Sequence, residues 1–336
     1  MSKPVFICIM PIKNESWILE RSLRCNSLWA DQIIVADQSD NKECLKIAEQ
    51  FPKVKYIVNT SSKYSEHERQ NILLHEARKT PQPRIIFSLD ADEVLSANHA
   101  ESQEWKTIQE TREGTAIYIP RIEILPDVET YWTVNPTGFL RGYIDDGKDL
   151  DGQVIHGPLL PLTPQTPWLM LKEIKLLHYQ YAEWRRMDSK HRWYLCFERL
   201  INRPGLSSIT AFRDYRHMYS VGADEIKPIN PIWFRRYQEN GIDMTSIKKE
   251  GTYWYDREVI KWLDKYGMEK FSREAIWDVD WTAISLTLGL NPSGKIYKDP
   301  RSFFRRAVHK WLRETQKIRS KWCVRMIDKI LKKIGC

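Results

Sequence analysis

Four short apolar runs occur within residues 1–90, and each contains five or six residues rich in Val and Ile. They predict β-strands over residues 5–10, 32–37, 54–58 and 85–89. The segments between these runs place apolar residues three or four positions apart, which is the spacing typical of helices. Strands that alternate with helices predict a parallel sheet covered by helices, so the expected fold class is α/β.

Later parts of the chain give less regular patterns. Helices are expected over residues 96–110 and 182–200, and single strands over residues 116–125 and 169–179. The intervening residues 126–167 hold six prolines and five glycines, which indicates loops. We therefore expect a domain over residues 1–204, a helical region over 205–297 and a basic helical tail over 298–336.

Polar side chains follow three of the predicted strands, namely Asn14, Asp37, Asp90 and Asp92. Parallel sheets bind ligands in the crevice beyond the carboxyl ends of their strands, so this placement predicts a binding site there. Asp90 and Asp92 could share a Mg²⁺ or Mn²⁺ ion whose shell is completed by water and substrate phosphates. A solvated acidic turn after a core strand is the alternative.

Four motifs occur in order: Pro11-Ile-Lys13-Asn14-Glu15, Ile33-Ile-Val-Ala-Asp37-Gln-Ser-Asp40, Arg69-Gln-Asn71 and Leu89-Asp90-Ala-Asp92-Glu93. This ordered set resembles family-2 glycosyltransferases of the GT-A fold. Three further motifs are similar to the branch that contains bacterial lipopolysaccharide-core glucosyltransferases: Gly152-Gln-Val-Ile-His156-Gly, Leu177-His178-Tyr179-Gln-Tyr181 and Lys190-His-Arg192. The resemblance covers about residues 4–200.

The resemblance implies a GT-A-like nucleotide-diphospho-sugar transferase, with a Rossmann-like, mostly parallel sheet flanked by helices and a mainly helical C-terminal extension. It implies a hexosyltransferase that moves a sugar from a nucleotide-diphosphate donor, expected to be a UDP-sugar, to a glycan or lipid-linked acceptor. The nucleotide and donor contacts that it implies are Pro11, Lys13, Asn14, Glu15, Asp37, Arg69, Asp90 and Ala91.

The resemblance also implies a Mn²⁺ or Mg²⁺ cofactor, with Asp92 as the main ligand and Asp90 and His178 as further ligands. It places His156 and Tyr179 near the acceptor. Three of these residues keep a plainer alternative: Asp37 as a helix cap, Arg69 as an exposed helical residue, and His178 as a structural histidine after an apolar strand.

Transfer with inversion, which the resemblance favours, needs a general base to take the proton of the acceptor hydroxyl. The similar branch often has an acidic residue after the histidine of its loop, whereas Gly157 stands there in this chain. The base is therefore not assigned, and Asp149, Asp151 and Glu183 are its candidates.

The net charge of +8 is concentrated in the tail, because residues 298–336 carry 13 Lys and Arg against 3 Asp and Glu. The tail also repeats apolar residues at helical spacing: Phe304, Val308, Trp311, Thr315, Ile318, Trp322, Met326 and Ile330. A basic amphipathic helix of this kind predicts contact with an anionic membrane surface, with docking on the protein itself or on a partner as the alternative. Nucleic acid is not expected, since the remaining residues are slightly acidic.

The six cysteines show no metal-binding spacing, and no apolar run approaches the roughly 18 residues of a membrane span. A cytoplasmic protein, peripheral at the membrane face, is therefore expected. Two other functions stay open: a sugar-nucleotide pyrophosphorylase, although its glycine-rich first loop is missing here, and a non-catalytic binding protein on the same fold.

Overall fold

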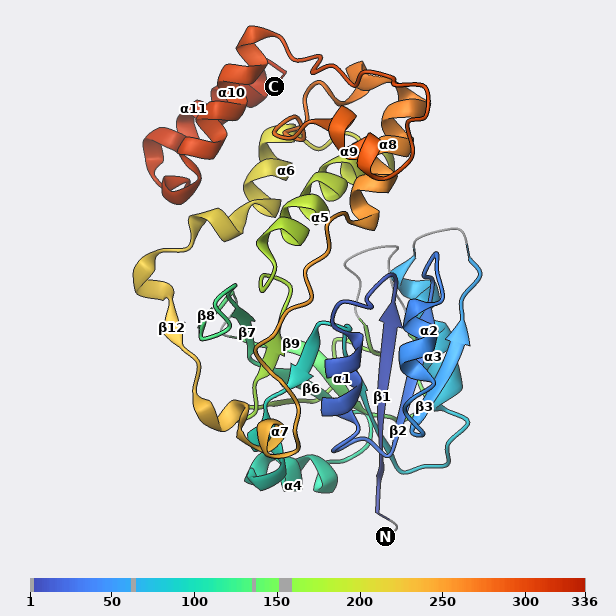
Figure 1. Cartoon of the computed structure of the whole chain (residues 1–336). Helices are drawn as coiled ribbons and strands as arrows, with labels where there is room; N and C mark the ends of the chain where they lie inside the picture. Colours follow the sequence, from blue (N-terminus) through green and yellow to red (C-terminus); the bar gives the residue numbers. More distant parts are fainter. Residues whose placement is uncertain (1–2, 62–64, 135–136, 151–158, 336) are drawn as a thin grey trace. The chain divides into compact units, whose positions relative to one another are not determined.

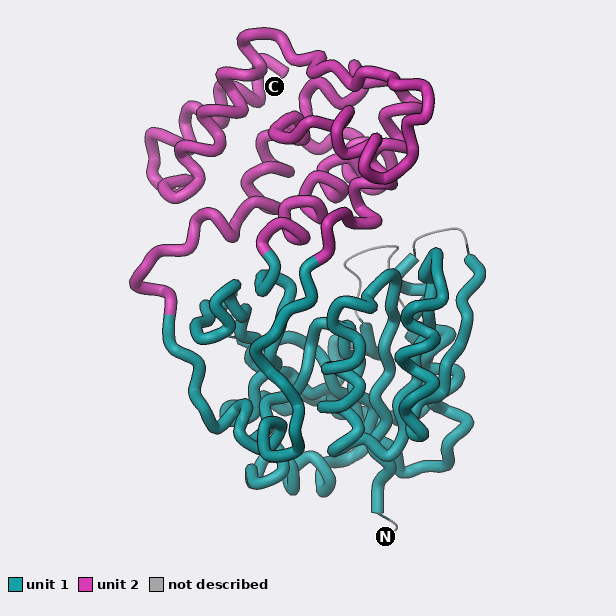
Figure 2. The backbone as a smooth tube through the Cα atoms, viewed as in Figure 1, with its two compact units in different colours: residues 1–183, 227–249 teal, residues 184–226, 250–336 magenta. Residues whose placement is uncertain are grey.

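The computed structural model describes residues 3–61, 65–134, 137–150 and 159–335. The chain forms two compact units (Figure 2). Unit 1 comprises residues 1–183 and 227–249, and unit 2 comprises residues 184–226 and 250–336. This division differs from the three predicted segments, because the chain leaves unit 1 after Glu183 and later returns to it for residues 227–249.

The main sheet of unit 1 contains the four predicted strands as parallel neighbours, in the order β4-β1-β2-β3 (Figure 1). Beyond β4 the sheet continues with β9, β6 and β10, in that order. Strand β9 is antiparallel to both β4 and β6, and β10 is parallel to β6. The strands are β1 (Val5–Ile12), β2 (Gln32–Asp37), β3 (Val54–Val58), β4 (Arg84–Ser88), β6 (Ala116–Ile119), β9 (Phe139–Ile144) and β10 (Trp168–Met170).

Alternate residues of β1 pack against helices on opposite faces of this sheet. Ile7 and Ile9 join the core cluster that contains Leu73 and Leu74 of α3 (Glu66–Ala77). Phe6, Cys8 and Met10 join the cluster that contains apolar residues of α1 (Leu19–Asn26) and α2 (Glu43–Ala48). The sheet is thus covered on both sides, which confirms the predicted α/β class and explains why β1, β2 and β4 are mostly apolar and buried.

The smaller sheet of unit 1 has the order β12-β8-β7-β11-β5. Its strands are β5 (Glu93–Leu95), β7 (Arg121–Ile124), β8 (Thr130–Trp132), β11 (Leu176–His178) and β12 (Lys227–Pro228). Strand β11 lies between β5, to which it is antiparallel, and β7, to which it is parallel. This sheet brings His178 beside the acidic turn that follows β4.

Two predicted long strands are wrong, because each is divided between the two sheets. Pro120 separates β6 from β7, and a proline lacks the N–H that a continuous sheet ladder requires. Between β10 and β11, the carboxylate of Glu104 accepts hydrogen bonds from the backbone N–H groups of Glu173 and Ile174, both at 3.0 Å. These bonds hold the chain in a turn where the sequence pattern had predicted a strand.

The helix predicted over residues 96–110 is also divided, into η1 (Ala97–Glu101) and α4 (Gln103–Glu110). Ser102 caps α4 by accepting a hydrogen bond of 3.1 Å from the N–H of Glu104. Residues 227–249 complete unit 1 with η5 (Pro231–Trp233) and α7 (Arg235–Glu239).

Unit 2 consists of helices in the part of the chain that the structure describes. They are α5 (Trp184–Phe197), η2 (Glu198–Asn202), α6 (Ser208–Tyr215), η3 (His217–Ser220), η4 (Ala223–Glu225), α8 (Trp254–Tyr266), η6 (Met268–Phe271), α9 (Trp281–Thr287), α10 (Phe303–Glu314), η7 (Gln316–Ile318) and α11 (Trp322–Lys333). The tail is therefore two helices joined by a short turn. Within the described residues, no helix is long and apolar enough to span a bilayer.

Candidate functional site

The carboxyl ends of β1, β2 and β4 meet at one edge of the main sheet. Ile12 of β1 pairs with Asp37 of β2, and Ile9 of β1 pairs with Ser88 of β4. The loop that begins at Lys13, the residues after Asp37 and the acidic turn therefore share this edge. The sequence predicted this convergence, and the strand register now gives it a geometric basis.

Asn14 connects two of these loops. Its backbone adopts a positive φ of 56°, and its N–H donates to the Ser39 hydroxyl oxygen at 2.7 Å. Its side-chain amide donates to Asp40 Oδ2 at 3.1 Å, while the N–H of Asp40 donates to Asn14 Oδ1 at 3.0 Å. Asn14 does not cap the first helix, which begins at Leu19 without a side-chain cap. It holds the loops after β1 and β2 together.

Asp37 is buried at the end of β2, with 5% of its surface exposed. The N–H and hydroxyl of Ser39 donate to its Oδ1 at 2.7 and 2.5 Å, and the Tyr56 hydroxyl donates to its Oδ2. Burial and the adjacent Asp37 carboxylate raise the pKa of Tyr56, so the phenol keeps its proton as a donor. Asp37 does not cap α2, whose N-cap is Lys42.

The acidic turn after β4 places its three carboxylates in different environments. The side chain of Asp90 is 45% exposed, whereas that of Asp92 is 9% exposed and that of Glu93 is fully buried. Arg141 of β9 contacts Glu93 Oε1 at 2.7 Å and Asp90 Oδ2 at 3.3 Å. The backbone N–H of Asp90 donates to Glu93 Oε2 at 3.1 Å. Glu93 therefore stabilises the turn from inside, Asp92 is largely buried, and Asp90 is the most exposed carboxylate of the three.

His178 lies between two carboxylates because β11 runs between β5 and β7. Its Nε2 is 3.6 Å from Asp92 Oδ1, and its Nδ1 is 2.7 Å from Glu123 Oε2. Glu123 is directly opposite His178 in the register of β7 and β11. The N–H of Tyr179 also donates to the Asp92 carbonyl oxygen at 2.8 Å, which fixes the acidic turn against β11.

Burial and charge act in opposite directions on His178 and Glu123. Burial alone would lower the pKa of His178, but the Glu123 and Asp92 carboxylates outweigh burial and raise this pKa to about 9. Burial would raise the pKa of Glu123, but His178 and Arg121 lower it to about 2. Arg121 Nη2 lies 2.8 Å from Glu123 Oε1. Without a metal ion, the two residues therefore form a buried ion pair that Arg121 supports.

Asp92 and His178 form a pair of donors that fits part of a Mn²⁺ or Mg²⁺ site. One hard carboxylate oxygen and one imidazole nitrogen face each other at 3.6 Å, and a carboxylate beyond the imidazole is the usual outer partner of a metal-binding histidine. Among the described residues, no cluster of three or more His, Cys, Asp and Glu side chains could hold a metal ion. An ion at this pair would therefore need further ligands from a substrate or from water.

The other predicted donor residues lie in unit 1 with varied exposure. Pro11, Lys13 and Glu15 are half-buried, and Glu15 Oε2 accepts a hydrogen bond of 2.6 Å from the Trp17 indole. Ala91 is buried in the acidic turn. Arg69 is only 7% exposed on α3, so its alternative interpretation as an exposed helical residue is wrong.

The residues predicted for acceptor binding and for the base receive less support. Tyr179 is fully buried, and its hydroxyl donates to the Met244 carbonyl oxygen at 3.0 Å, so this side chain has a packing role and does not support an acceptor contact. Glu183 is buried at the end of unit 1, and the Asp149 carboxylate is exposed. Asp151 and His156 lie outside the described residues. The base stays unassigned.

Sequence reasoning missed three charged residues of this site: Arg121, Glu123 and Arg141. Glu123 and Arg121 alternate with apolar residues in β7, and such alternation usually indicates a solvent-facing side of a strand. Both side chains are instead largely buried, with 14% of the Arg121 side chain and none of the Glu123 side chain exposed. The alternation of charged and apolar residues is visible in the sequence, but only the pairing of β7 with β11 shows that Glu123 lies beside His178.

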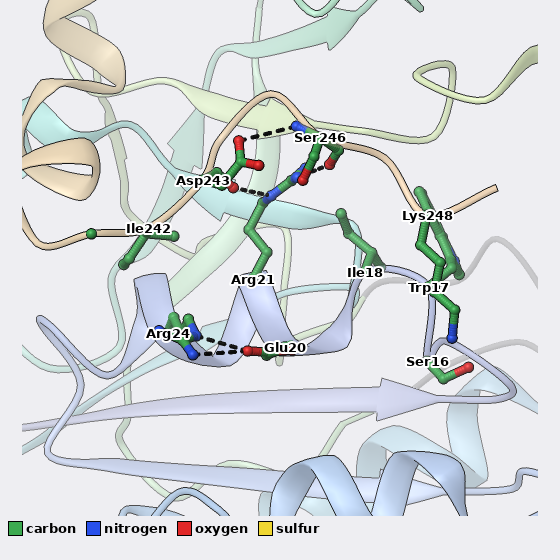
Figure 3. A pocket seen from close by; sticks show the side chains of 11 residues that line it. Ser16, Trp17, Ile18, Glu20, Arg21, Arg24, Ile242, Asp243, Ser246 and Lys248 are labelled. Carbon is green, nitrogen blue, oxygen red and sulfur yellow. Dashed lines mark hydrogen bonds and ion pairs between the residues drawn. The ribbon is translucent and has the colours of Figure 1, made fainter.

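A separate pocket of about 370 Å³ lies between α1 and residues 241–248 (Figure 3). The Arg21 side chain donates through Nε to the Asp243 carbonyl oxygen at 2.8 Å and through Nη2 to the Ser246 carbonyl oxygen, and it stacks on the Tyr179 ring. Arg21 thus attaches residues 243–246 to α1. The pocket is not lined by Asp37, Asp92 or His178, so it is distinct from the edge of the sheet described above.

No protein-family model and no curated protein matches the chain. Among solved structures, it is similar to a 4-diphosphocytidyl-2C-methyl-D-erythritol synthase, with 14% identity, 43% of this chain and 76% of that chain covered, and a TM-score of 0.30. It is also similar to mannose-6-phosphate isomerase from Helicobacter pylori, with 13% identity, 42% of this chain and 61% of that chain covered, and a TM-score of 0.27. A third similar structure is mannose-1-phosphate geranyltransferase from Thermus thermophilus, with 11% identity, 39% of this chain and 46% of that chain covered, and a TM-score of 0.26. At these identities and TM-scores, the likeness carries no conclusion about the reaction.

Proposed function

We propose that the protein is a metal-dependent glycosyltransferase of the GT-A type that uses a UDP-sugar donor and a glycan or lipid-linked acceptor. The observation that carries the proposal is the pair formed by Asp92 and His178 at the sheet edge that also holds Asp37. A buried carboxylate for a nucleobase and a metal-ligating pair for a diphosphate are the two recognition elements that a nucleotide-sugar donor needs. Their shared edge favours this function over a solvated acidic turn.

Asp37 is proposed to accept a hydrogen bond from the uracil N–H. Ser39 and Tyr56 already fix the orientation of its carboxylate, so little ordering remains to be done when the base binds. The loop with Asn14 borders the same region through its bonds to Ser39 and Asp40. A rigid acceptor of this kind discriminates against bases that lack a matching donor.

Asp92 and His178 are proposed to hold Mn²⁺ or Mg²⁺, with Asp90 beside them as an exposed contact to the donor. When bound, such an ion neutralises charge on the departing diphosphate. The ion pair between Glu123 Oε2 and Nδ1, at 2.7 Å, is proposed to orient the imidazole so that Nε2 faces Asp92. Since the His178 pKa is raised to about 9, His178 must release a proton before Nε2 can act as a ligand.

Binding of a nucleotide sugar tests this function in its simplest form. In a thermal-shift panel, UDP-sugars should raise the melting temperature more with Mn²⁺ than without it, since a ligand at 100 times its dissociation constant stabilises by about 2.7 kcal/mol. Transfer to an acceptor, with free UDP as the second product, would separate a glycosyltransferase from a pyrophosphorylase, which forms a sugar phosphate. A panel without any nucleotide-dependent shift would refute the proposal.

Asp37→Asn should weaken UDP binding, because an amide replaces the charged acceptor at the proposed base site. Hydrogen bonds to charged groups contribute about 1.5 to 3 kcal/mol, so the dissociation constant should rise roughly ten- to a hundredfold. Isothermal titration with UDP and Mn²⁺ measures this change. The control is Asp31→Asn, since Asp31 accepts from the Phe6 N–H at the opposite end of β1. Equal UDP affinity in wild type and Asp37→Asn would remove Asp37 from the site.

A further inference from the structure

Helix α11 of unit 2 exposes a row of apolar side chains. Trp322, Met326 and Ile330 of α11 and Ile334, which caps its C-terminal end, follow each other at intervals of four residues, and these residues are 76%, 40%, 55% and 61% exposed. Residues four apart lie on one face of a helix, so these side chains form a continuous row along α11. Exposed Ile327 borders the row. We call these five residues the α11 apolar face.

The opposite side of α11 is fixed to unit 2 by a buried ion pair. Asp328 accepts hydrogen bonds from Arg213 Nε at 2.8 Å and Arg213 Nη2 at 3.0 Å, and from the Trp311 indole at 3.2 Å. Arg213 is buried and also donates to the Leu312 carbonyl oxygen at 2.9 Å. Rotation of α11 to bury its apolar face would leave Arg213 without its carboxylate, and breaking such a pair is strongly destabilising.

Basic side chains lie next to the α11 apolar face. Arg325, Lys329, Lys332 and Lys333 are all exposed, and Asp328 is the one acidic residue of α11. At 100° per residue, Arg325, Lys329 and Lys332 occupy the sector between the Asp328 side of the helix and Trp322. Lys333 lies at the C-terminal end of α11, at the angular position of the apolar row. The carboxylate of Asp328 is paired with Arg213 and does not neutralise these basic residues.

We propose that α11 lies in the headgroup layer of an anionic bilayer, with its apolar face inserted and its basic residues against lipid phosphates. The α11 apolar face and its basic neighbours match this environment, because the apolar side chains contact acyl chains and the basic side chains contact lipid phosphates. A second copy of the same face would oppose basic residues to basic residues. Nucleic acid would leave the Met and Ile side chains in water.

Paired substitutions in the full-length chain test this proposal by co-sedimentation with vesicles of phosphatidylcholine and phosphatidylglycerol. Trp322→Ser with Ile330→Ser should lower the partition coefficient at least tenfold. The matched control is Leu286→Ser with Ile296→Ser, because these side chains of unit 2 are 55% and 72% exposed outside α11. The control should bind as wild type does. Substitutions are preferred to removal of residues 302–336, which would leave Arg213 unpaired.

Two further measurements show how the contact forms. Higher salt should weaken vesicle binding, and so should the double variant Lys329→Gln/Lys333→Gln. Vesicles of phosphatidylcholine alone should bind less protein than the anionic mixture. Cys323 is exposed, whereas Cys8, Cys25, Cys44 and Cys196 are buried. An environment-sensitive fluorophore on Cys323, in a Cys336→Ser background, should shift to shorter wavelength with anionic vesicles.

Equal binding of wild type and the Trp322/Ile330 variant, or no binding of wild type to anionic vesicles, would overturn the proposal. A change in sedimentation coefficient of the variant in lipid-free buffer, without a change in vesicle binding, would identify a protein interface instead. The proposal does not depend on the catalytic one. Stabilisation of the variant by UDP-sugar and Mn²⁺ should equal that of wild type.

Discussion

Asp92→Asn should lower the turnover rate at least about a hundredfold, which corresponds to roughly 2.7 kcal/mol of additional barrier. Asp92 is the carboxylate that faces His178 Nε2, and its proposed contact stabilises charge that grows as the diphosphate leaves. An interaction that is stronger in the transition state than in the ground state must affect turnover. The amide retains the size of the side chain, so the fold should be unchanged.

Comparison with neighbouring variants identifies what Asp92 does. Asp90→Asn should have a smaller effect on turnover, because Asp90 is half exposed and contacts Arg141. Glu93→Gln should change stability more than turnover, since Glu93 is buried against Arg141. His178→Ala should raise the Mn²⁺ concentration needed for half-maximal turnover. A fully active Asp92→Asn enzyme would contradict the proposed role.

Glu123→Ala should destabilise the protein by about 3 to 5 kcal/mol, because it leaves Arg121 and protonated His178 buried without their carboxylate. Urea unfolding followed by circular dichroism measures this loss. The control is Glu129→Ala, an exposed position that follows β7, which should change stability by less than about 0.5 kcal/mol. Equal stability of wild type and Glu123→Ala would contradict the buried ion pair.

The destabilisation by Glu123→Ala should depend on pH in a defined way. The Glu123 pKa is lowered from 4.5 to about 2, so its contribution is complete above pH 4.5 and lost as pH falls through 2. The His178 pKa is raised from 6.5 to about 9, so its contribution is complete below pH 6.5 and lost as pH rises through 9. The difference from wild type should thus be largest between pH 4.5 and 6.5.

Local sequence patterns were sufficient for the main sheet. Three of its four parallel strands, β1, β2 and β4, are mostly apolar and buried between helices on both faces, whereas β3 at the edge of the sheet is only partly buried. Asp37 is the last residue of β2, and Asp92 lies in the short turn between β4 and β5. Both were identified because polar residues at the end of an apolar strand lie at the edge of the sheet. The placement of these residues is therefore a local property.

The smaller sheet could not be predicted in this way, because its strands are two to four residues long and pair across distant parts of the chain. Glu123 and His178 are 55 positions apart, and only the register of β7 with β11 brings them together. Arg141 belongs to β9 of the main sheet and contacts Glu93 in β5 of the smaller sheet. The sequence shows the residues that make such contacts, but it does not show which distant strands pair to bring them together.

The tail shows a different limit of hydrophobic periodicity. The spacing of Trp322, Met326 and Ile330 predicts an amphipathic helix, and α11 is one. The same spacing would normally predict that this face is buried against the protein. The buried side of α11 is instead the one that carries Val324 and Asp328, where Asp328 pairs with Arg213. Periodicity therefore identifies the apolar face of the helix, whereas the contacts of the opposite side determine which face is buried.

Metal dependence can be measured as the release of UDP from a UDP-sugar by the wild-type protein while metal is removed and restored. Exhaustive chelation should abolish release, added Mn²⁺ should restore it, and the Mn²⁺ affinity should rise with pH as His178 loses its proton. Undiminished release after exhaustive chelation would contradict the metal-dependent mechanism at Asp92 and His178.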